Sequence, residues 1–222
     1  MNLTKQIRKD REQFQKLPDR KSRLTFIWDY YKIPIIAVLT LFCFLTIIIS
    51  TNLKRSDVSI YAVLLNSDSL IAECDDTVFD ELLKETDVDL KGRHADINDR
   101  FFLGTEGNDS EDGETLQVLS AMFSLDEIDV FVADKDHFDL FCKEGAYEDL
   151  GTVIPEDRQS KHEDMLYRYE DDNGKIIIAG LILKENSPLH KAGYYHNEVI
   201  LGMAANCGHK TEASALIDLL IK

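Results

Sequence analysis

Hydrophobic residues form one long uninterrupted segment near the N-terminus. Residues 33–53 read IPIIAVLTLFCFLTIIISTNL, contain no charged side chain and are bracketed by Lys32 and Lys54. A helix rises 1.5 Å per residue, so this segment makes a helix about 30 Å long, which is the thickness of the hydrocarbon core of a bilayer. The pattern predicts one transmembrane helix over residues 33–53.

A cleaved signal peptide, a lipoprotein signal and a buried core helix are the alternatives for this segment. A signal peptide has an apolar core of about 7 to 15 residues that ends in small residues. Here the core is longer and the residues after it, Thr51, Asn52 and Leu53, lack that pattern. Cys43 follows two bulky apolar residues, whereas a lipoprotein signal has small residues before its cysteine. These features favour a retained anchor.

After residue 53 the pattern changes to short apolar runs that alternate with amphipathic stretches. Runs rich in β-branched residues predict strands, and apolar residues at helical spacing predict helices. Strands that alternate with helices are typical of an α/β domain with a largely parallel sheet, and we expect a single domain of this class. The predicted strands are residues 57–66, 87–97, 127–133, 175–183 and 198–205, and the predicted helices are residues 75–85, 114–123, 135–144, 156–167 and 210–221.

The clearest local signals lie around the strand predicted at residues 127–133. Asp134 follows this strand and is a favoured N-cap, and Gly145 stands where a left-handed residue often ends a helix. Further along, Asp172, Asn173 and Gly174 predict a hairpin turn ahead of the strand at residues 175–183. A strand, a capped helix and a hairpin are therefore expected in this order.

Charge divides the chain at the apolar segment. Residues 1–32 contain nine Lys and Arg against four Asp and Glu, a net charge of +5, and this leaves −21 for the rest of a chain whose total is −16. Clustered positive charge holds its side of a membrane segment in the cytoplasm. We therefore predict a basic cytoplasmic segment over residues 1–32 and an acidic extracellular domain over residues 54–222. Such a domain repels nucleic acid, so no nucleic-acid partner is expected.

Aromatic and basic residues precede the apolar segment. Trp28, Tyr30, Tyr31 and Lys32 fall where the lipid headgroups should lie, and amphipathic rings favour that depth. We predict that these four residues form the membrane interface, with lipid as their partner. Contact with another membrane protein, such as a transporter, is the alternative.

Three cysteines follow the apolar segment: Cys74, Cys142 and Cys207. An odd number argues against a disulfide scaffold, so we interpret them as small buried residues. One disulfide with a spare thiol is the alternative, because an extracellular compartment permits it.

Two segments partly match metal-binding motifs, and each lacks a residue that its motif requires. Residues 108–119 partly follow a calcium-binding loop, but Leu119 stands where a bidentate Glu is needed. His162 and Glu163 resemble the start of a zinc-protease helix, but Leu166 stands where the second His is needed. No cofactor or metal is therefore expected. The histidines without ligand spacing, for which surface or capping roles are favoured, are His137, His190 and His196.

Two segments resemble extracellular solute-binding proteins of ABC importers, of the type II periplasmic-binding-protein class. In residues 128–150 a strand, a helix, a Gly and an apolar turn follow one another, and Gly145, Tyr147 and Leu150 fill the family's positions. Residues 198–221 are similar to a late strand and helix of that family. There Asn206 and Ala213 match, and Cys207 replaces the usual Ser.

The resemblance implies a domain built like one lobe of a solute-binding protein. Members of the family have two lobes with the ligand between them, and residues 54–222 are enough for one. The resemblance therefore implies the fold and carries over no binding residue. The segment IWDYYK, residues 27–32, is similar to the start of uncharacterised membrane-anchored proteins of Gram-positive gut bacteria.

Three functions compete on these grounds. The leading hypothesis is a single-pass, non-enzymatic extracellular domain that binds a partner or ligand, as an accessory of a transporter. A tether of this kind keeps the domain at high effective concentration beside another membrane protein. The second is a cell-envelope scaffold or sensor without a small ligand. An enzyme is the third and least favoured, because no set of acid, base and nucleophile can be named.

Overall fold

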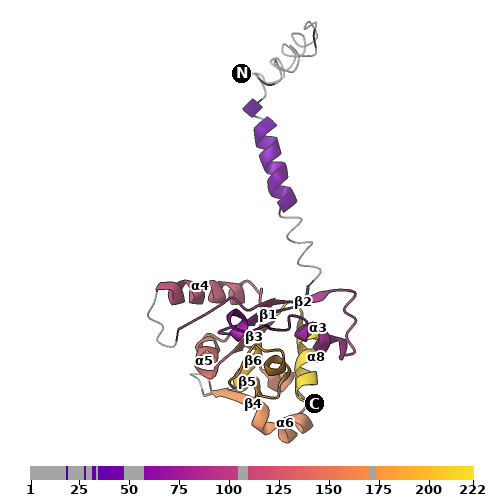
Figure 1. Cartoon of the computed structure of the whole chain (residues 1–222), viewed down its shortest axis with the longest axis vertical. Coiled ribbons are helices and arrows are strands. Elements are labelled where there is room, and N and C mark those ends of the chain that lie inside the picture. Colours follow the sequence, from indigo (N-terminus) through magenta and orange to yellow (C-terminus); the bar gives the residue numbers. More distant parts are fainter. Residues whose placement is uncertain are drawn as a thin grey trace. The chain divides into compact units, whose positions relative to one another are not determined.

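The computed structural model describes residues 19, 28, 32–33, 35–47, 58–104, 110–170 and 174–222. The chain divides into two compact units, Met1–Arg55 and Ser56–Lys222, and both are drawn in Figure 1. The second unit contains all the strands of the described residues.

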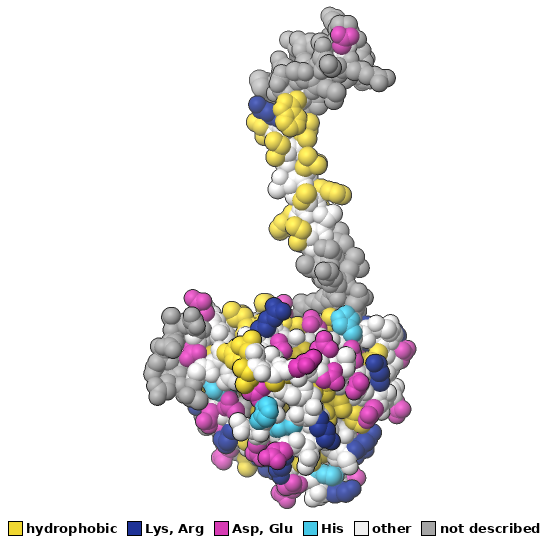
Figure 2. Space-filling model, viewed as in Figure 1, with side chains coloured by type: hydrophobic (Ala, Val, Ile, Leu, Met, Phe, Trp, Pro, Cys, Tyr) yellow, Lys and Arg dark blue, Asp and Glu magenta, His cyan; other side chains and the backbone are white. Residues whose placement is uncertain are grey.

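In the N-terminal unit, residues 35–47 form a helix with exposed apolar side chains, shown in yellow in Figure 2. The hydroxyls of Thr40 and Thr46 donate hydrogen bonds to backbone carbonyls one turn earlier, at 2.9 and 3.0 Å. Within the described residues, no helix is both long and apolar enough to cross a membrane. Residues 34 and 48–53 of the predicted anchor lie outside the described residues, and the anchor stays a prediction.

The second unit is a mixed α/β domain with a six-stranded sheet in the order β2-β1-β3-β6-β5-β4. The strands are β1 (Val58–Leu64), β2 (His94–Asn98), β3 (Val130–Ala133), β4 (Leu166–Glu170), β5 (Ile176–Leu183) and β6 (Val199–Met203). The helices are α3 (Val78–Lys84), α4 (Ser110–Ser124), α5 (Lys135–Lys143), α6 (Glu156–Lys161), α7 (Pro188–Lys191) and α8 (Lys210–Leu220), with short 3-10 turns η1 (Asp68–Leu70), η2 (Leu150–Thr152) and η3 (Glu163–Met165).

The prediction of a largely parallel sheet is wrong. Strand β1 runs parallel to both β2 and β3, but β3–β6, β5–β6 and β4–β5 are antiparallel pairs. A short turn can join only antiparallel strands, and the segment between β4 and β5 is short. Strand β6 then enters between β5 and β3 and runs antiparallel to both. The first half of the domain is therefore a βαβ arrangement and the second half a meander.

Helices cover both faces of the sheet (Figure 1). The two cores that they enclose differ in composition. One face packs aliphatic side chains of β1, β5 and β6 against α3 and α8. The other packs aromatic side chains beneath α4 and α5. There the rings of Phe138 and Tyr147 stack at 4.1 Å. A Cβ atom at Gly202 would lie 2.7 Å from the Phe138 ring, so β6 needs glycine at this position.

Most predicted elements are confirmed, and three of their boundaries are wrong by four residues or more. The helix after Pro155 ends at Lys161, and Tyr167 lies in β4, because pairing with β5 outweighs the local helical pattern. Strand β2 begins at His94 rather than at residue 87. Helix α4 begins at Ser110 rather than at residue 114, since the acidic residues of the expected loop suit a helix N-terminus.

Candidate functional site

The chain changes direction across the sheet between β1 and β3. From β1 it passes through α3 to β2 on one side, and from β2 it passes through α4 to β3 on the other side. Helices α3 and α4 accordingly cover opposite faces. In open α/β sheets, ligands bind beside the carboxyl ends of the strands at such a switch point. We therefore define the carboxyl edge as the residues that follow β1, β2 and β3, together with Tyr195 and His196, which contact them.

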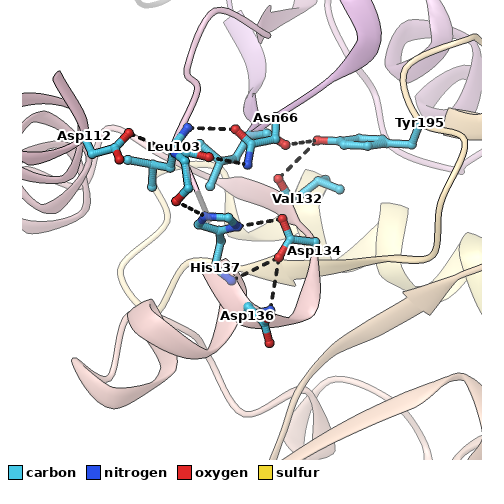
Figure 3. A network of polar contacts seen from close by, with 10 residues as sticks. Asn66, Leu103, Asp112, Val132, Asp134, Asp136, His137 and Tyr195 are labelled. Carbon is cyan, nitrogen blue, oxygen red and sulfur yellow. Dashed lines mark hydrogen bonds and ion pairs between the residues drawn. The ribbon is translucent and has the colours of Figure 1, made fainter. Parts of the chain in front are cut away.

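At the end of β1, Asn66 fixes the loop that follows β2. Its φ of 53° lies in the left-handed region, which Asn adopts more readily than most residues. Its amide group donates to the carbonyl of Leu103 at 2.9 Å and accepts from the Leu103 N–H at 2.8 Å. Figure 3 shows this pair of hydrogen bonds. The end of β1 and the loop after β2 are thus joined side by side.

At the end of β3, Asp134 caps α5 as the sequence predicted. Its carboxylate accepts from the N–H groups of Asp136 and His137, at 3.1 and 3.2 Å. The His137 Nδ1 atom lies 2.6 Å from the same carboxylate, and its Nε2 atom lies 3.4 Å from the carbonyl oxygen of Gly104 (Figure 3). His137 is buried. Asp134 is the capping residue and His137 is held by it in the interior, so the surface or capping role expected for His137 is wrong.

Tyr195 closes the gap between the ends of β1 and β3. Its buried hydroxyl donates to the carbonyl of Leu65 at 2.9 Å and lies 3.3 Å from that of Val132 (Figure 3). Burial raises the pKa of this hydroxyl, and the carboxylates of Asp134, Asp68 and Asp99 raise it further. These three carboxylates follow three different strands. We call the buried Tyr195 the floor of the carboxyl edge and the three carboxylates its negatively charged rim.

One contact between a histidine and a carboxylate on this rim lies largely in solvent. The Nδ1 atom of His196 lies 2.6 Å from the carboxylate of Asp68, and the His196 side chain is 72% exposed. The hydroxyls of Ser67 and Ser69 both donate to the backbone carbonyl of Asp99 at 3.2 Å. These hydrogen bonds join the loops after β1 and β2, and they leave the partly exposed Asp68 and Asp99 carboxylates where they can attract a positively charged group.

The opposite, amino end of β3 holds a carboxylate of another kind. Asp129 is buried and accepts from the N–H of Tyr61 at 2.8 Å and from the N–H of His209 at 2.9 Å. The His209 Nδ1 atom lies 2.8 Å from the same carboxylate. Nearby, burial and the Asp129 charge raise the pKa of the Cys207 thiol to about 11, so it is protonated at neutral pH.

The residues predicted for the membrane interface lie in the N-terminal unit. Trp28 and Lys32 are exposed and helical. Tyr30 and Tyr31 lie outside the described residues. Among the residues that have been placed, no group of three or more His, Cys, Asp or Glu side chains can hold a metal ion. The failed calcium motif is explained as well, because Leu119 is buried in the aromatic core.

The cysteines of the α/β domain are all free thiols. Cys142 is buried, as interpreted from the sequence, whereas Cys74 and Cys207 are half-buried. Burial raises the pKa of all three thiols, to about 12 for Cys142. None of the three has the lowered pKa of a reactive cysteine.

The carboxyl edge was not predicted from the sequence, although the sequence contains one signal for it. Asn66 and Asp134 are polar residues at the ends of two apolar runs, and strand ends are where α/β domains place ligands. Tyr195 and His196 carry no such signal, because they belong to a loop distant in sequence.

Comparisons with protein-family models, with curated proteins and with solved structures found no match to this chain.

Proposed function

We propose that this protein is a single-pass, membrane-anchored, non-enzymatic domain that binds a partner or ligand at its carboxyl edge. In this proposal residues 33–53 span the membrane, residues 1–32 stay in the cytoplasm and the α/β domain lies outside the cell. The charge-free segment and the basic residues before it support this orientation. An accessory role beside a transporter fits a domain that is tethered close to other membrane proteins.

The observation that carries the proposal is the meeting of Asp68, Asp99 and Asp134 at the switch point. Each follows a different strand. The Ser67 hydroxyl donates to the Asp99 carbonyl, and the Tyr195 hydroxyl bridges the ends of β1 and β3. Carboxylates that are partly exposed on a fixed floor attract ammonium or guanidinium groups. The expected ligand therefore carries positive charge, either as a small solute or as a basic protein surface.

A cell-envelope scaffold or sensor without a small ligand is the second candidate. Tyr195 favours this candidate, because its side chain lies between the strand ends and its hydroxyl already donates a hydrogen bond to the carbonyl of Leu65. A surface closed in this way suits a protein partner better than a solute that needs a deep pocket.

A thermal-shift screen of the full-length chain in detergent micelles tests the binding proposal. The probes are basic amino acids, polyamines, Lys-rich and Arg-rich peptides, and neutral sugars as controls. A ligand at about 100 times its dissociation constant stabilises the folded state by about 2.7 kcal/mol. We expect a cationic probe to raise the unfolding temperature.

The shift should disappear in the Asp68→Asn/Asp99→Asn double variant. It should persist in Glu144→Gln, which removes one exposed carboxylate at the far end of α5. Equal shifts in the two variants would mean that the cation binds to the overall negative charge and not to the carboxyl edge.

The orientation needs its own test. Protease added to intact cells should digest the α/β domain and leave residues 1–32 protected. A soluble, shortened protein in the medium would show instead that the apolar segment is cleaved.

A further inference from the structure

Two large apolar side chains project from the carboxyl edge into solvent. Leu70 is 75% exposed and Ile71 is 86% exposed, the two highest values among the exposed large hydrophobic residues of the α/β domain. They are neighbours in the loop that follows β1, which we call the docking loop and define as residues 67–76. Exposed apolar side chains that adjoin one another indicate an interaction surface, whereas single scattered ones do not.

The backbone of the docking loop is held at both ends. The N–H of Asp68 donates to the carbonyl of Tyr194 at 2.8 Å, and the N–H of Asp75 donates to that of Ala192 at 2.9 Å. Gly193 lies between the two acceptor residues, in the segment that packs against the docking loop. Its φ is 88°, and a Cβ atom there would lie 3.1 Å from the carbonyl oxygen of Glu73. The loop is therefore preorganised, so binding through Leu70 and Ile71 costs less conformational entropy than ordering a flexible loop.

Charge determines which kind of partner suits this loop. The sequence has no Lys or Arg between Arg55 and Lys84, so every charged side chain of the docking loop is acidic. Thr77 donates two hydrogen bonds to Asp75 and lowers the pKa of that carboxyl. The residues from 33 onward carry −21 in total, so a second copy of the chain and an anionic lipid surface are both repelled. Acidic side chains are also spread over the visible face of the domain in Figure 2.

We infer that the docking loop inserts Leu70 and Ile71 into an apolar pocket of a protein partner whose rim carries Lys and Arg. The inference rests on the proposed binding function and names the partner class for the same edge. Apolar side chains at the centre with complementary charges around them are the usual anatomy of a protein interface. The acidic rim steers the encounter, and the two aliphatic side chains slow dissociation.

In-cell photo-crosslinking with the full-length chain tests this inference. A photoreactive amino acid is placed at Ile71, at His196 or at Leu125 in cells of the native host. Leu125 is the matched control, because it is exposed, has acidic neighbours and precedes the amino end of β3. His196 belongs to the carboxyl edge but not to the docking loop. Cross-linked peptides are then sequenced by mass spectrometry.

We expect position 71 to give at least about tenfold more protein adduct than position 125, as for the centre of an interface. The cross-linked partner peptide should have Lys or Arg beside the modified residue. Leu70→Ser should reduce the adduct at position 71 by about tenfold or more, and so should high salt during irradiation. Circular dichroism verifies that Leu70→Ser leaves the fold intact.

The inference is overturned if position 71 gives no adduct, an adduct equal to that at position 125, or one with lipid or with a second copy of the chain. An adduct that survives Leu70→Ser, or a partner peptide without basic neighbours, also overturns it. An adduct at position 196 without one at position 71 would contradict the docking-loop inference but not the proposed binding function. If neither position gives an adduct, the inference and the proposed function are both contradicted.

Discussion

Two His–Asp pairs lie at opposite ends of the β1–β3 strand pair and differ mainly in burial. His209 and Asp129, at the amino end, lie 2.8 Å apart and their side chains are 23% and 3% exposed. His196 and Asp68, at the carboxyl end, lie 2.6 Å apart and are 72% and 29% exposed. The same two residue types thus serve two purposes. The buried pair joins β1, β3 and the start of α8, whereas the exposed pair is available to a partner.

The difference shows why residue type alone is a poor guide to function in a chain this acidic. A buried carboxylate with several donors contributes to folding and is costly to remove. An exposed ion pair contributes little to stability, since water screens it. A functional site is therefore expected where charged groups are fixed in place and still reach the solvent, as they do at the carboxyl edge.

The largest expected effect comes from Asp129→Ala. This change leaves the N–H groups of Tyr61 and His209 without their acceptor in the interior. We expect it to lower the free energy of unfolding by about 3–5 kcal/mol, as measured by urea titration. Asp68→Ala is the matched control and should cost no more than about 1 kcal/mol. Similar losses in the two variants would contradict the comparison.

Gly202→Ala is expected to be the next most damaging change. Gly202 pairs with Phe131 in β3, and the new methyl group would collide with the stacked rings of Phe138 and Tyr147. Overpacking of this kind costs about 1–3 kcal/mol. Gly113→Ala in α4 is the control, because no neighbouring atom lies within 4 Å of the added Cβ. The control should gain about 0.5–1 kcal/mol from helix propensity, and a loss there would show that glycine is needed for another reason.

Sequence patterns predicted the parts of the fold that local interactions determine. Asp134 and Gly145 marked the two ends of α5, because an N-cap and a left-handed C-terminal residue act within a few positions of themselves. The antiparallel half of the sheet was predicted only in part. The turn signal before residue 175 agrees with the β4–β5 pair. The insertion of β6 between β3 and β5 was missed, because it depends on pairing between distant segments. For the same reason the role of Tyr195 was not predicted, because its hydroxyl bonds to a carbonyl 130 positions away in the sequence.

Alkaline pH should destabilise the domain through its thiols. Burial raises the pKa of Cys207 from 9.0 to about 11, so the folded state holds this proton more tightly than the unfolded chain does. The stabilisation is fully present below about pH 9 and is lost as the pH rises through 11. Cys207→Ala should flatten the fall in unfolding free energy over this window by about 1 kcal/mol, after discount for solvent screening. An unchanged pH profile would contradict this assignment.

Thiol labelling gives a second readout of the same burial. In the native protein at pH 8, Cys142 should react slowly with a thiol reagent, because burial raises its pKa to about 12. Unfolding without reductant should make the thiols of the α/β domain reactive, since all three are free. A disulfide between any two of them would leave fewer reactive groups and would contradict the structure.

The smallest expected effect on stability is that of His196→Ala. Loss of this exposed pair should change the unfolding free energy by about 0.5 kcal/mol or less. His209→Ala removes the corresponding buried contact and should cost about 1–3 kcal/mol. Urea titrations of the two variants, run side by side, measure the contrast between the two ends of the sheet without any ligand. Equal losses of unfolding free energy in the two variants would contradict this contrast.

Hydrogen exchange of the full-length chain tests the central claim that the carboxyl edge is the binding surface. Exchange is compared between vesicles of the native membrane, where partners are present, and detergent micelles, where they are diluted away. We expect slower exchange in vesicles over residues 66–76 and 194–197, with no change over residues 125–129 and 207–209. Protection at the amino end of β3, or equal exchange everywhere in the two preparations, would contradict it.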